Sequence, residues 1–204
     1  MASRLDSLVA EIRACRLCLE DPVGKPLPHE PHPVVHVGRQ ARILVIGQAP
    51  GTRVHLSGKP FTDRSGDRLR DWMGVTSDEF YDRSKVAIMP MGFCFPGQDA
   101  KGGDLPPRRE CAPHWHERLL AELPHIELTL LIGQYAQARY LGARARRTLT
   151  ETVAAWADYG TSAIPLPHPS WRNTGWLKKN PWFERDVLPV LRRRIRDLIG
   201  QGEG

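Results

Sequence analysis

The chain has no long apolar run. Nowhere in its 204 residues does an uninterrupted apolar stretch approach the roughly 20 residues that a membrane-spanning helix needs. A secretory signal is also missing, because the first stretch, MASRLDSLVAEIRAC, places acidic residues inside an amphipathic pattern. These absences argue against membrane insertion and export, and they predict a cytoplasmic protein.

Cysteine is scarce, with four residues in the chain. Because cytoplasmic thiols stay reduced, we expect no disulfide bonds, and all four thiols are available to a metal. The sequence also has no internal repeat, no low-complexity tract, no GxGxxG motif and no lysine of a phosphate-binding loop. A nucleotide-phosphate site is therefore the function that this sequence supports least.

Length and charge set two further bounds. The length suits one large domain over residues 1–204, with a helix and a cysteine pair in residues 1–20 and a flexible tail at 200–204. The net charge of +6 and the pI near 9.4 favour a polyanionic partner without proving one. Each basic cluster is equally compatible with a solvated helix face. The clusters are Arg144, Arg146, Arg147, Lys178, Lys179 and residues 192–196.

Apolar periodicity predicts strands that alternate with helices. Runs such as ARILVIG and ELTLLIG are typical of buried parallel strands, whereas amphipathic stretches predict helices, and five prolines at 22–33 predict a loop. We expect strands at 41–47, 85–89, 127–133 and 163–166, and helices at 3–15, 65–73, 111–123, 133–142, 148–156 and 182–199, the last interrupted or kinked at Pro189. The predicted fold class is α/β: a three-layer α/β/α sandwich around a central, mostly parallel four-stranded sheet.

The four cysteines form two pairs from distant parts of the chain. Cys15 and Cys18 make a CxxC motif, and Cys94 and Cys111 flank a loop rich in proline and glycine. Four thiolates suit zinc as well as an iron–sulfur cluster. Four unrelated buried cysteines are the alternative, and a redox CxxC is disfavoured because Cys15 follows a helix instead of beginning one.

Two short segments carry candidate chemistry. The turn GQAPG, residues 47–51, follows a predicted strand, and its glycines allow the backbone to approach a ligand closely. His168 lies between two prolines, which restrict the backbone and so fix the direction of the imidazole. Alone, the GQAPG turn is equally compatible with a tight connection between a strand and a helix, and the simpler interpretation of His168 is a loop histidine without a function.

Together, the motifs resemble a known family. The stretch GQAPGTRVHLSGKPFTDRSGDRL resembles, without a gap, the first motif of the family 4 uracil-DNA glycosylases, where a GE(G or A)PG turn, an acidic stretch and GRPFVG follow one another. LTLLIGQYAQARYLG is similar to that family's strand, glycine turn and alanine-rich helix, and PLPHPSWRN is similar to its HPS or HPA motif. The cysteines fall where the family places its 4Fe–4S ligands. Five motifs in register are specific where one is not.

The resemblance implies a DNA-binding enzyme that rotates a damaged nucleotide out of the helix into a pocket. Phe61 matches the aromatic residue that stacks on the flipped base, and His168 matches the histidine that stabilises negative charge on the pyrimidine O2. Cys15, Cys18, Cys94 and Cys111 match the cluster ligands, with zinc or no metal as alternatives. The implied catalytic pair is His168 and Gln48, and the implied substrate-binding residues are Gly47, Ala49, Pro50, Gly51, Phe61, Met91 and Ser170.

The sequence departs from the family at two positions. Gln48 stands where family 4 has glutamate, and an amide orients water but cannot take its proton. Asp63 and His55 are the possible substitutes for the missing carboxylate. Pro90 and Met91 stand where the family has an asparagine that reads the base edge. A base other than uracil, such as hypoxanthine or xanthine, is therefore plausible, and the backbone near Met91 can still make contacts.

Residues after His168 match the family's DNA-contacting segment. Trp171 and Arg172 are candidates for insertion into the gap that the flipped base leaves, or else belong to a surface loop. Asn173, Lys178 and Lys179 are further candidates for DNA contacts, since cations near aromatic residues suit phosphate binding. The expected protein is a monomeric, monofunctional DNA glycosylase that hydrolyses the N-glycosidic bond of uracil or another deaminated base. The alternative is a nucleic-acid-binding module of the same fold, with iron–sulfur or zinc, that has lost catalysis.

Overall fold

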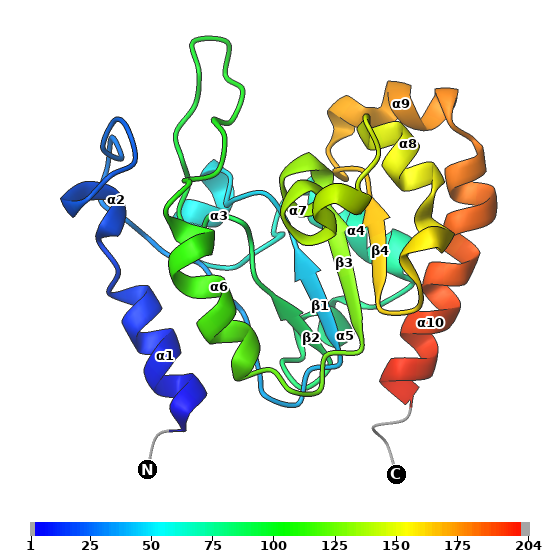
Figure 1. Cartoon of the computed structure of the whole chain (residues 1–204), viewed down its shortest axis with the longest axis horizontal. Coiled ribbons are helices and arrows are strands. Elements are labelled where there is room, and N and C mark those ends of the chain that lie inside the picture. The colour runs from blue at the N-terminus through cyan, green and yellow to red at the C-terminus, as the bar shows by residue number, and fades with distance from the viewer. Residues whose placement is uncertain (1–2, 201–204) are drawn as a thin grey trace.

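We describe the fold from a computed structural model, in which residues 3–200 are described (Figure 1). The strands are β1 (Ile43–Ile46), β2 (Val86–Ile88), β3 (Leu128–Ile132) and β4 (Ala163–Leu166). The longer helices are α1 (Arg4–Arg13), α4 (Arg64–Met73), α6 (Cys111–Ala121), α7 (Gly133–Leu141) and α10 (Leu188–Gly200). The shorter ones are α2 (Leu17–Glu20), α3 (Thr52–Ser57), α5 (Ser77–Tyr81), α8 (Leu149–Ala154) and α9 (Thr174–Lys179). Beyond Gly200, the predicted flexible tail lies outside the described residues.

The four strands form one sheet in the order β2-β1-β3-β4, and every pairing between them is parallel. β1 is central, and the chain moves to β2 on one side of it before it crosses to β3 and β4 on the other. The predicted mostly parallel, four-stranded sheet is thus confirmed. In such a sheet, ligands gather at the carboxyl ends of the strands where the strand order reverses, which here is between β1 and β3.

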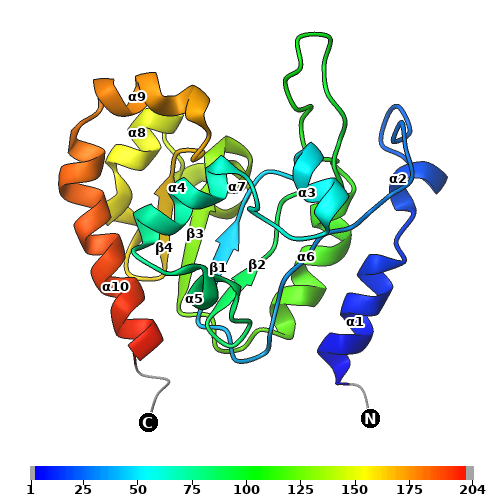
Figure 2. The ribbon, with the colours of Figure 1, turned by 180° about the vertical axis from the view of Figure 1, so that it is seen from behind.

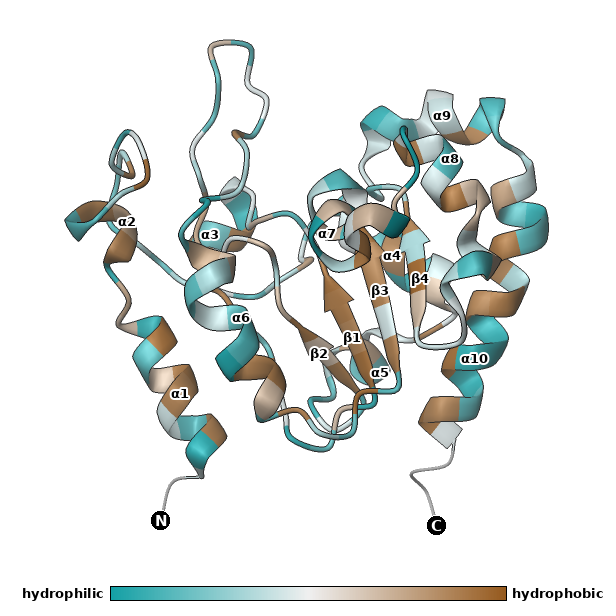
Figure 3. Ribbon diagram, viewed as in Figure 1, coloured by the Kyte–Doolittle hydropathy of each residue, from teal (hydrophilic) through white to brown (hydrophobic). Residues whose placement is uncertain are grey.

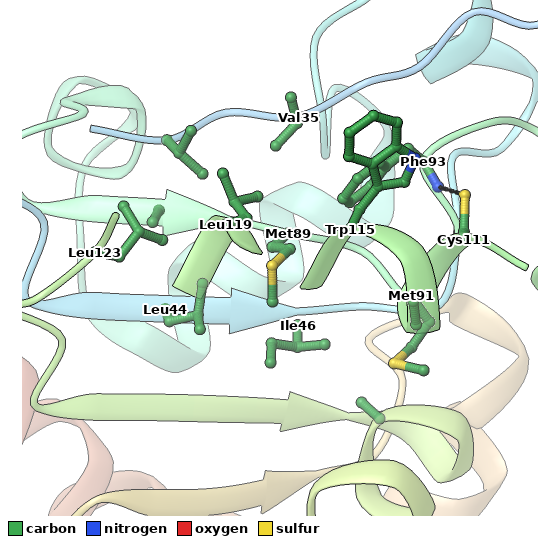
Figure 4. Packing of buried hydrophobic residues seen from close by; sticks show 14 of the residues in the cluster. Val35, Leu44, Ile46, Met89, Met91, Phe93, Cys111, Trp115, Leu119 and Leu123 are labelled. Atoms are coloured by element: carbon green, nitrogen blue, oxygen red, sulfur yellow. Dashed lines mark hydrogen bonds between the residues drawn. The ribbon is translucent and has the colours of Figure 1, made fainter. Parts of the chain in front are cut away.

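Alternate residues of each strand build two apolar cores on opposite faces of the sheet, and Figure 3 shows that the strands are mainly apolar. Leu44 and Ile46 join the core that α1, α6 and α7 cover, and Figure 4 shows Met89, Trp115 and Leu119 packed there. Ile43 and Val45 join the second core, which α4, α5 and α10 cover (Figure 2). The strands are buried on both faces, as parallel strands between two helical layers must be, and the predicted three-layer sandwich is confirmed.

Helix ends follow ordinary capping rules. Ser3 and Thr148 begin α1 and α8 with complete capping boxes, and Asp63 caps α4 through the backbone N–H of Gly66. Gly58 ends α3 in the left-handed conformation that glycine adopts without strain. Within residues 3–200, no helix has the length and apolar composition that a membrane span requires.

The segment at 182–199 is helical, and its regular helix is interrupted just before Pro189. A π-helix covers Phe183–Val187, and α10 begins afterwards at Leu188. Pro189 is the second residue of α10, so its missing N–H falls where the helical hydrogen-bond pattern changes. The helix predicted at 148–156 is shorter than expected, because a 3-10 turn at Trp156–Tyr159 follows α8.

The basic face of α10 serves mainly to attach this helix to the rest of the fold. Arg192 donates to the carbonyl of Asp71, Arg194 to that of Gly160, and Arg196 forms an ion pair with Glu79 at 2.8 Å. Arg192, Arg194 and Arg196 thus have hydrogen-bond or ion-pair partners on neighbouring elements of the protein.

A buried histidine, His116, connects α6 to α7 and to the segment after β2. His116 of α6 is 1% exposed, and its ring nitrogens lie 2.6 Å from the Tyr140 hydroxyl and 3.0 Å from the Pro90 carbonyl oxygen. Burial lowers the pKa of His116 to about 4. The neutral ring therefore donates from Nε2 to Pro90 and accepts at Nδ1 from Tyr140.

This histidine makes stability depend on pH. The unfolded chain protonates His116 near pH 6.5, whereas the folded protein does not until about pH 4, so acidification favours unfolding in that window. We expect His116→Gln, which keeps one donor and one acceptor, to reduce the loss of stability between pH 7 and 4.5 by the order of 2 kcal/mol. Urea unfolding at both pH values measures this, with His125→Gln on the surface as the control. Equal losses in wild type and His116→Gln contradict it.

Candidate active site

A cavity of about 80 Å³ opens at the carboxyl ends of the strands. Its volume is several times what one water molecule needs. The turn after β1, the segment after α3 and the segment after β4 meet around it. The lining residues are Val34, Gly47, Gln48, Ala49, Pro50, Gly51, Val54, Pro60, Phe61, Asp63, Ser65, Ile88, Pro90, Asp104 and His168. The GQAPG turn, the Phe61 ring and the His168 imidazole thus share one cavity.

His168 is held as a neutral donor. The backbone N–H of Ser170 donates to His168 Nδ1 at 3.2 Å, which requires Nδ1 to be unprotonated and leaves the proton on Nε2. Burial lowers the pKa of His168, against the opposing effect of Asp63 and Asp104. The imidazole that lines the cavity therefore carries its proton on Nε2 and has no positive charge.

Three side chains from elsewhere in the chain fix the segment that carries His168. Asn173 donates to the His168 carbonyl oxygen at 2.7 Å, and Arg68 of α4 donates to the Ser170 carbonyl oxygen at 2.9 Å. The buried Gln137 of α7 donates to Leu131 and Leu166 and so joins the ends of β3 and β4. The sequence analysis missed Arg68 and Gln137, since nothing in their local pattern shows these partners.

Phe61 has a strained backbone. Its φ of 54° makes it the one non-glycine residue with positive φ among residues 3–200, and a bulky residue adopts this conformation rarely. Its carbonyl oxygen accepts from Tyr81 Oη at 3.0 Å and from Arg70 Nη1 at 3.2 Å. Gly66 lies so close that a Cβ there would stand 1.8 Å from the same oxygen. These contacts hold the Phe61 ring beside the cavity.

The two departures from the family motifs are Gln48 and the pair Pro90 and Met91. The Gln48 side chain donates to the Leu105 carbonyl oxygen at 3.5 Å. The backbone N–H of Met91 donates to Gly47, and the Met91 side chain packs in the core on the α6 side of the sheet, as Figure 4 shows. The Pro90 carbonyl is bonded to His116. Met91 is thus not among the residues that line the cavity, although it was expected to contact substrate.

A wider groove of about 370 Å³ adjoins the cavity. The two share His168, Asp63 and Asp104, so the groove leads directly to the imidazole. Of the residues expected to contact DNA, Trp171 and Arg172 line this groove, and the Trp171 side chain is 68% exposed. Ser170 lines it too, rather than the cavity. Arg53 and Arg64 add cationic side chains to its walls.

The remaining residues expected to contact DNA lie outside both hollows. Asn173 is half-buried, and its side chain donates a hydrogen bond to the His168 carbonyl oxygen. Lys178 and Lys179 are exposed on the last turn of α9, which Figure 1 shows at the same end of the molecule as α3 and α7.

Three of the four cysteines lie together, and all four are free thiols. Hydrogen bonds with Cys111 and Cys94 hold the pKa of Cys18 well below its usual range. The same hydrogen bonds with Cys18 raise the pKa of Cys94 and the pKa of Cys111. The charge of Cys15 also reaches Cys111. As the side chains stand, no three His, Cys, Asp or Glu residues within 3–200 are arranged to hold a single metal ion.

The sequence of this chain matches one known protein family. The model of the uracil DNA glycosylase superfamily matches residues 35–192, more than half of the chain. The chain belongs to the uracil DNA glycosylase superfamily. Membership supports a glycosylase-type function that acts on DNA, and the match includes Phe61, His168 and every other residue that lines the cavity except Val34. Cys15 and Cys18 precede the matched residues, so the cluster and the family 4 assignment remain expectations.

The proline- and glycine-rich loop between Cys94 and Cys111 forms a hairpin-like projection. Figure 1 shows it rising above α3 and the start of α6 at the carboxyl end of the sheet. A bridge pairs Gln98 with Asp104, and Asp99 accepts the backbone N–H groups of Lys101 and Gly103 at the tip. The loop carries Asp104 to the wall of the cavity. A sequence signal existed in the Gly102-Gly103 turn, but not one that showed where the loop would lie.

The backbone contact at Phe61 yields a test of this glycosylase fold. In Gly66→Ala, the new methyl group must displace the Phe61 carbonyl, and we expect a loss of roughly 1–3 kcal/mol in stability, although alanine is the better helix former. Thermal and urea unfolding measure the loss. Gly175→Ala in α9, where a Cβ meets nothing within 4 Å, is the matched control and should be neutral or slightly stabilising. Equal behaviour of the two variants contradicts the close contact.

Proposed function

We propose that this member of the superfamily is a monofunctional DNA glycosylase that hydrolyses the N-glycosidic bond of uracil or another deaminated base. The observation that supports this most is the neutral His168, whose Nδ1 accepts a backbone hydrogen bond and which lines a cavity together with Phe61. A neutral donor aimed at a developing anion is the arrangement that stabilises a departing base.

In the proposed mechanism, the damaged nucleotide leaves the DNA stack and its base enters the cavity. The Phe61 ring, which contacts the Phe80 ring edge-to-face, stacks on the base. As the bond between C1′ and the base nitrogen breaks, its electron pair moves onto the base, and His168 donates to the oxygen that carries the charge. One such donor is worth about 10²–10³ in rate.

The choice of base follows from what replaces the family's asparagine. At Pro90 the chain offers no side-chain donor, and its carbonyl is already bonded to His116. A site built to bond a base edge rejects analogues strongly, whereas an apolar wall discriminates weakly. We therefore propose a tolerance for hypoxanthine or xanthine beside uracil, rather than strict uracil specificity.

DNA contacts are proposed for the residues around the groove. Trp171 is large, exposed and adjacent to the segment that carries His168, which suits a side chain that fills the gap left by the base. Arg172, Lys178 and Lys179 would meet phosphates, and these contacts make binding sensitive to salt.

Cys15, Cys18, Cys94 and Cys111 are proposed to hold a 4Fe–4S cluster, with zinc as the alternative. The donor set fits, because three buried thiols meet, the fourth is in electrostatic reach, and Arg108 favours a thiolate at Cys18. Thiolates are the ligands of such clusters. The cluster would join the segment after α1 to the start of α6, and its contribution would be stability rather than bond cleavage.

The enzyme proposal is tested with oligonucleotides that contain uracil, hypoxanthine or xanthine. We expect excision by the wild type and a single-turnover rate about 10²–10³-fold lower in His168→Ala, with little change in DNA affinity, because the donor acts in the transition state. His114→Ala, on the exposed side of α6, is the matched control and should keep the wild-type rate. Salt-dependent DNA binding with no abasic product from any of the three bases would instead support a non-catalytic binding module.

The cluster proposal has its own readout. Protein purified without oxygen should be brown and carry about four irons and four sulfides per chain. Cys94→Ser should lose the colour and the iron and unfold at a lower temperature, because a bound cluster stabilises only the folded state. A colourless protein with one zinc would identify the alternative metal, and a metal-free, stable protein would refute the site.

A further inference from the structure

Carboxylates are the groups that the mechanism above lacks. Water must lose a proton as it attacks C1′, and Gln48 cannot accept it. Two acidic side chains, Asp63 and Asp104, line the cavity and also the groove. Both act on the titration of His168, so both lie in electrostatic reach of the imidazole.

Asp63 is already committed to the fold. It is the N-cap of α4, and its Oδ1 accepts from Ser65 Oγ at 2.5 Å and from the backbone N–H of Gly66 at 3.3 Å. This role orders the helix that follows Phe61. The Asp63 carboxylate is thus engaged in hydrogen bonds that hold the start of α4.

Asp104 is placed differently. It comes from the projecting loop and reaches the first-motif turn, where a Cβ on Gly51 would stand 3.5 Å from Asp104 Oδ2. Its other oxygen, Oδ1, accepts from Gln98 Nε2 at 3.3 Å, which orients the carboxylate. The carboxylate is exposed along the groove, where water has access. It thus lies over the same turn whose glutamate this chain has replaced by Gln48.

We propose that Asp104 is a catalytic residue of this site and replaces the carboxylate that the first motif lacks. The inference rests on the proposed glycosylase function. As the C1′–N bond breaks, its electron pair leaves with the base, and the Asp104 carboxylate stabilises the positive charge on the sugar. A water oxygen then bonds to C1′, its proton passes to Asp104, and the departing base takes up a proton from solvent. Gln48 orients the water, and His168 acts on the base.

The first experiment separates chemistry from binding. For Asp104→Asn we expect a single-turnover rate about 10²–10⁴-fold below that of the wild type. DNA affinity should be equal or higher, because one negative charge near the phosphates is gone. Lys101→Ala, at the tip of the same loop, is the matched control and should keep the wild-type rate. A wild-type rate in Asp104→Asn, or a large loss in Asp63→Asn with none in Asp104→Asn, overturns the proposal.

The second experiment does not depend on excision. The probes are two oligonucleotides, one with a cationic pyrrolidine in place of the sugar and one with a neutral tetrahydrofuran abasic site. The wild type should bind the cationic probe at least tenfold more tightly, since it resembles the charged sugar, and Asp104→Asn should lose this preference while His168→Ala retains it. An equal preference in wild type and Asp104→Asn overturns the role of Asp104. Failure of the glycosylase function would appear separately, as an absence of excision by the wild type.

Discussion

Parallel pairing of β1 with β3, and of β3 with β4, is the constraint on which the site depends. The register pairs Val45 with Leu130 and Leu131 with Pro165, so the three strands end at nearly the same level. The turn after β1 and the segment after β4 therefore face one cavity, although more than 100 residues separate them. The buried Gln137 reinforces this, since its single amide group bonds the ends of β3 and β4 together. Any change that shifted this register would move His168 away from Phe61.

The electrostatics of the cavity place neutral and negative groups on different elements. Burial keeps His168 neutral even though Asp63 and Asp104 favour its protonated form. The imidazole is a donor without charge, and the carboxylates supply the negative potential. Such a division suits a bond that breaks into an anionic base and a cationic sugar, because each fragment meets the group that stabilises it. A protonated imidazole would pair with the carboxylates and weaken both contributions.

The sequence predicts the sheet well and the contacts between residues of the site poorly. Strands such as 41–47 and 127–133 were predictable because both faces are buried, which makes them continuously apolar. Resemblance to the family's motifs located Phe61 and His168, and the prolines on either side of His168 restrict its backbone. The left-handed backbone of Phe61 was not predictable, because it depends on Tyr81, Arg70 and Gly66, which reach it only in the folded protein. Asp104 was missed likewise, because its position depends on the path of a loop and not on local propensity.

Charge composition likewise does not predict which arginines lie near the candidate site. The basic excess suggested a polyanionic partner, yet the arginines of α10 bond to carbonyls and carboxylates of neighbouring elements. Three other arginines, Arg53, Arg64 and Arg172, come from separate segments and line the groove beside the cavity. A net charge sums both kinds and cannot distinguish them. The loops that converge at the carboxyl ends of the strands bring these arginines beside the cavity, so the sheet determines where the groove that they line adjoins it.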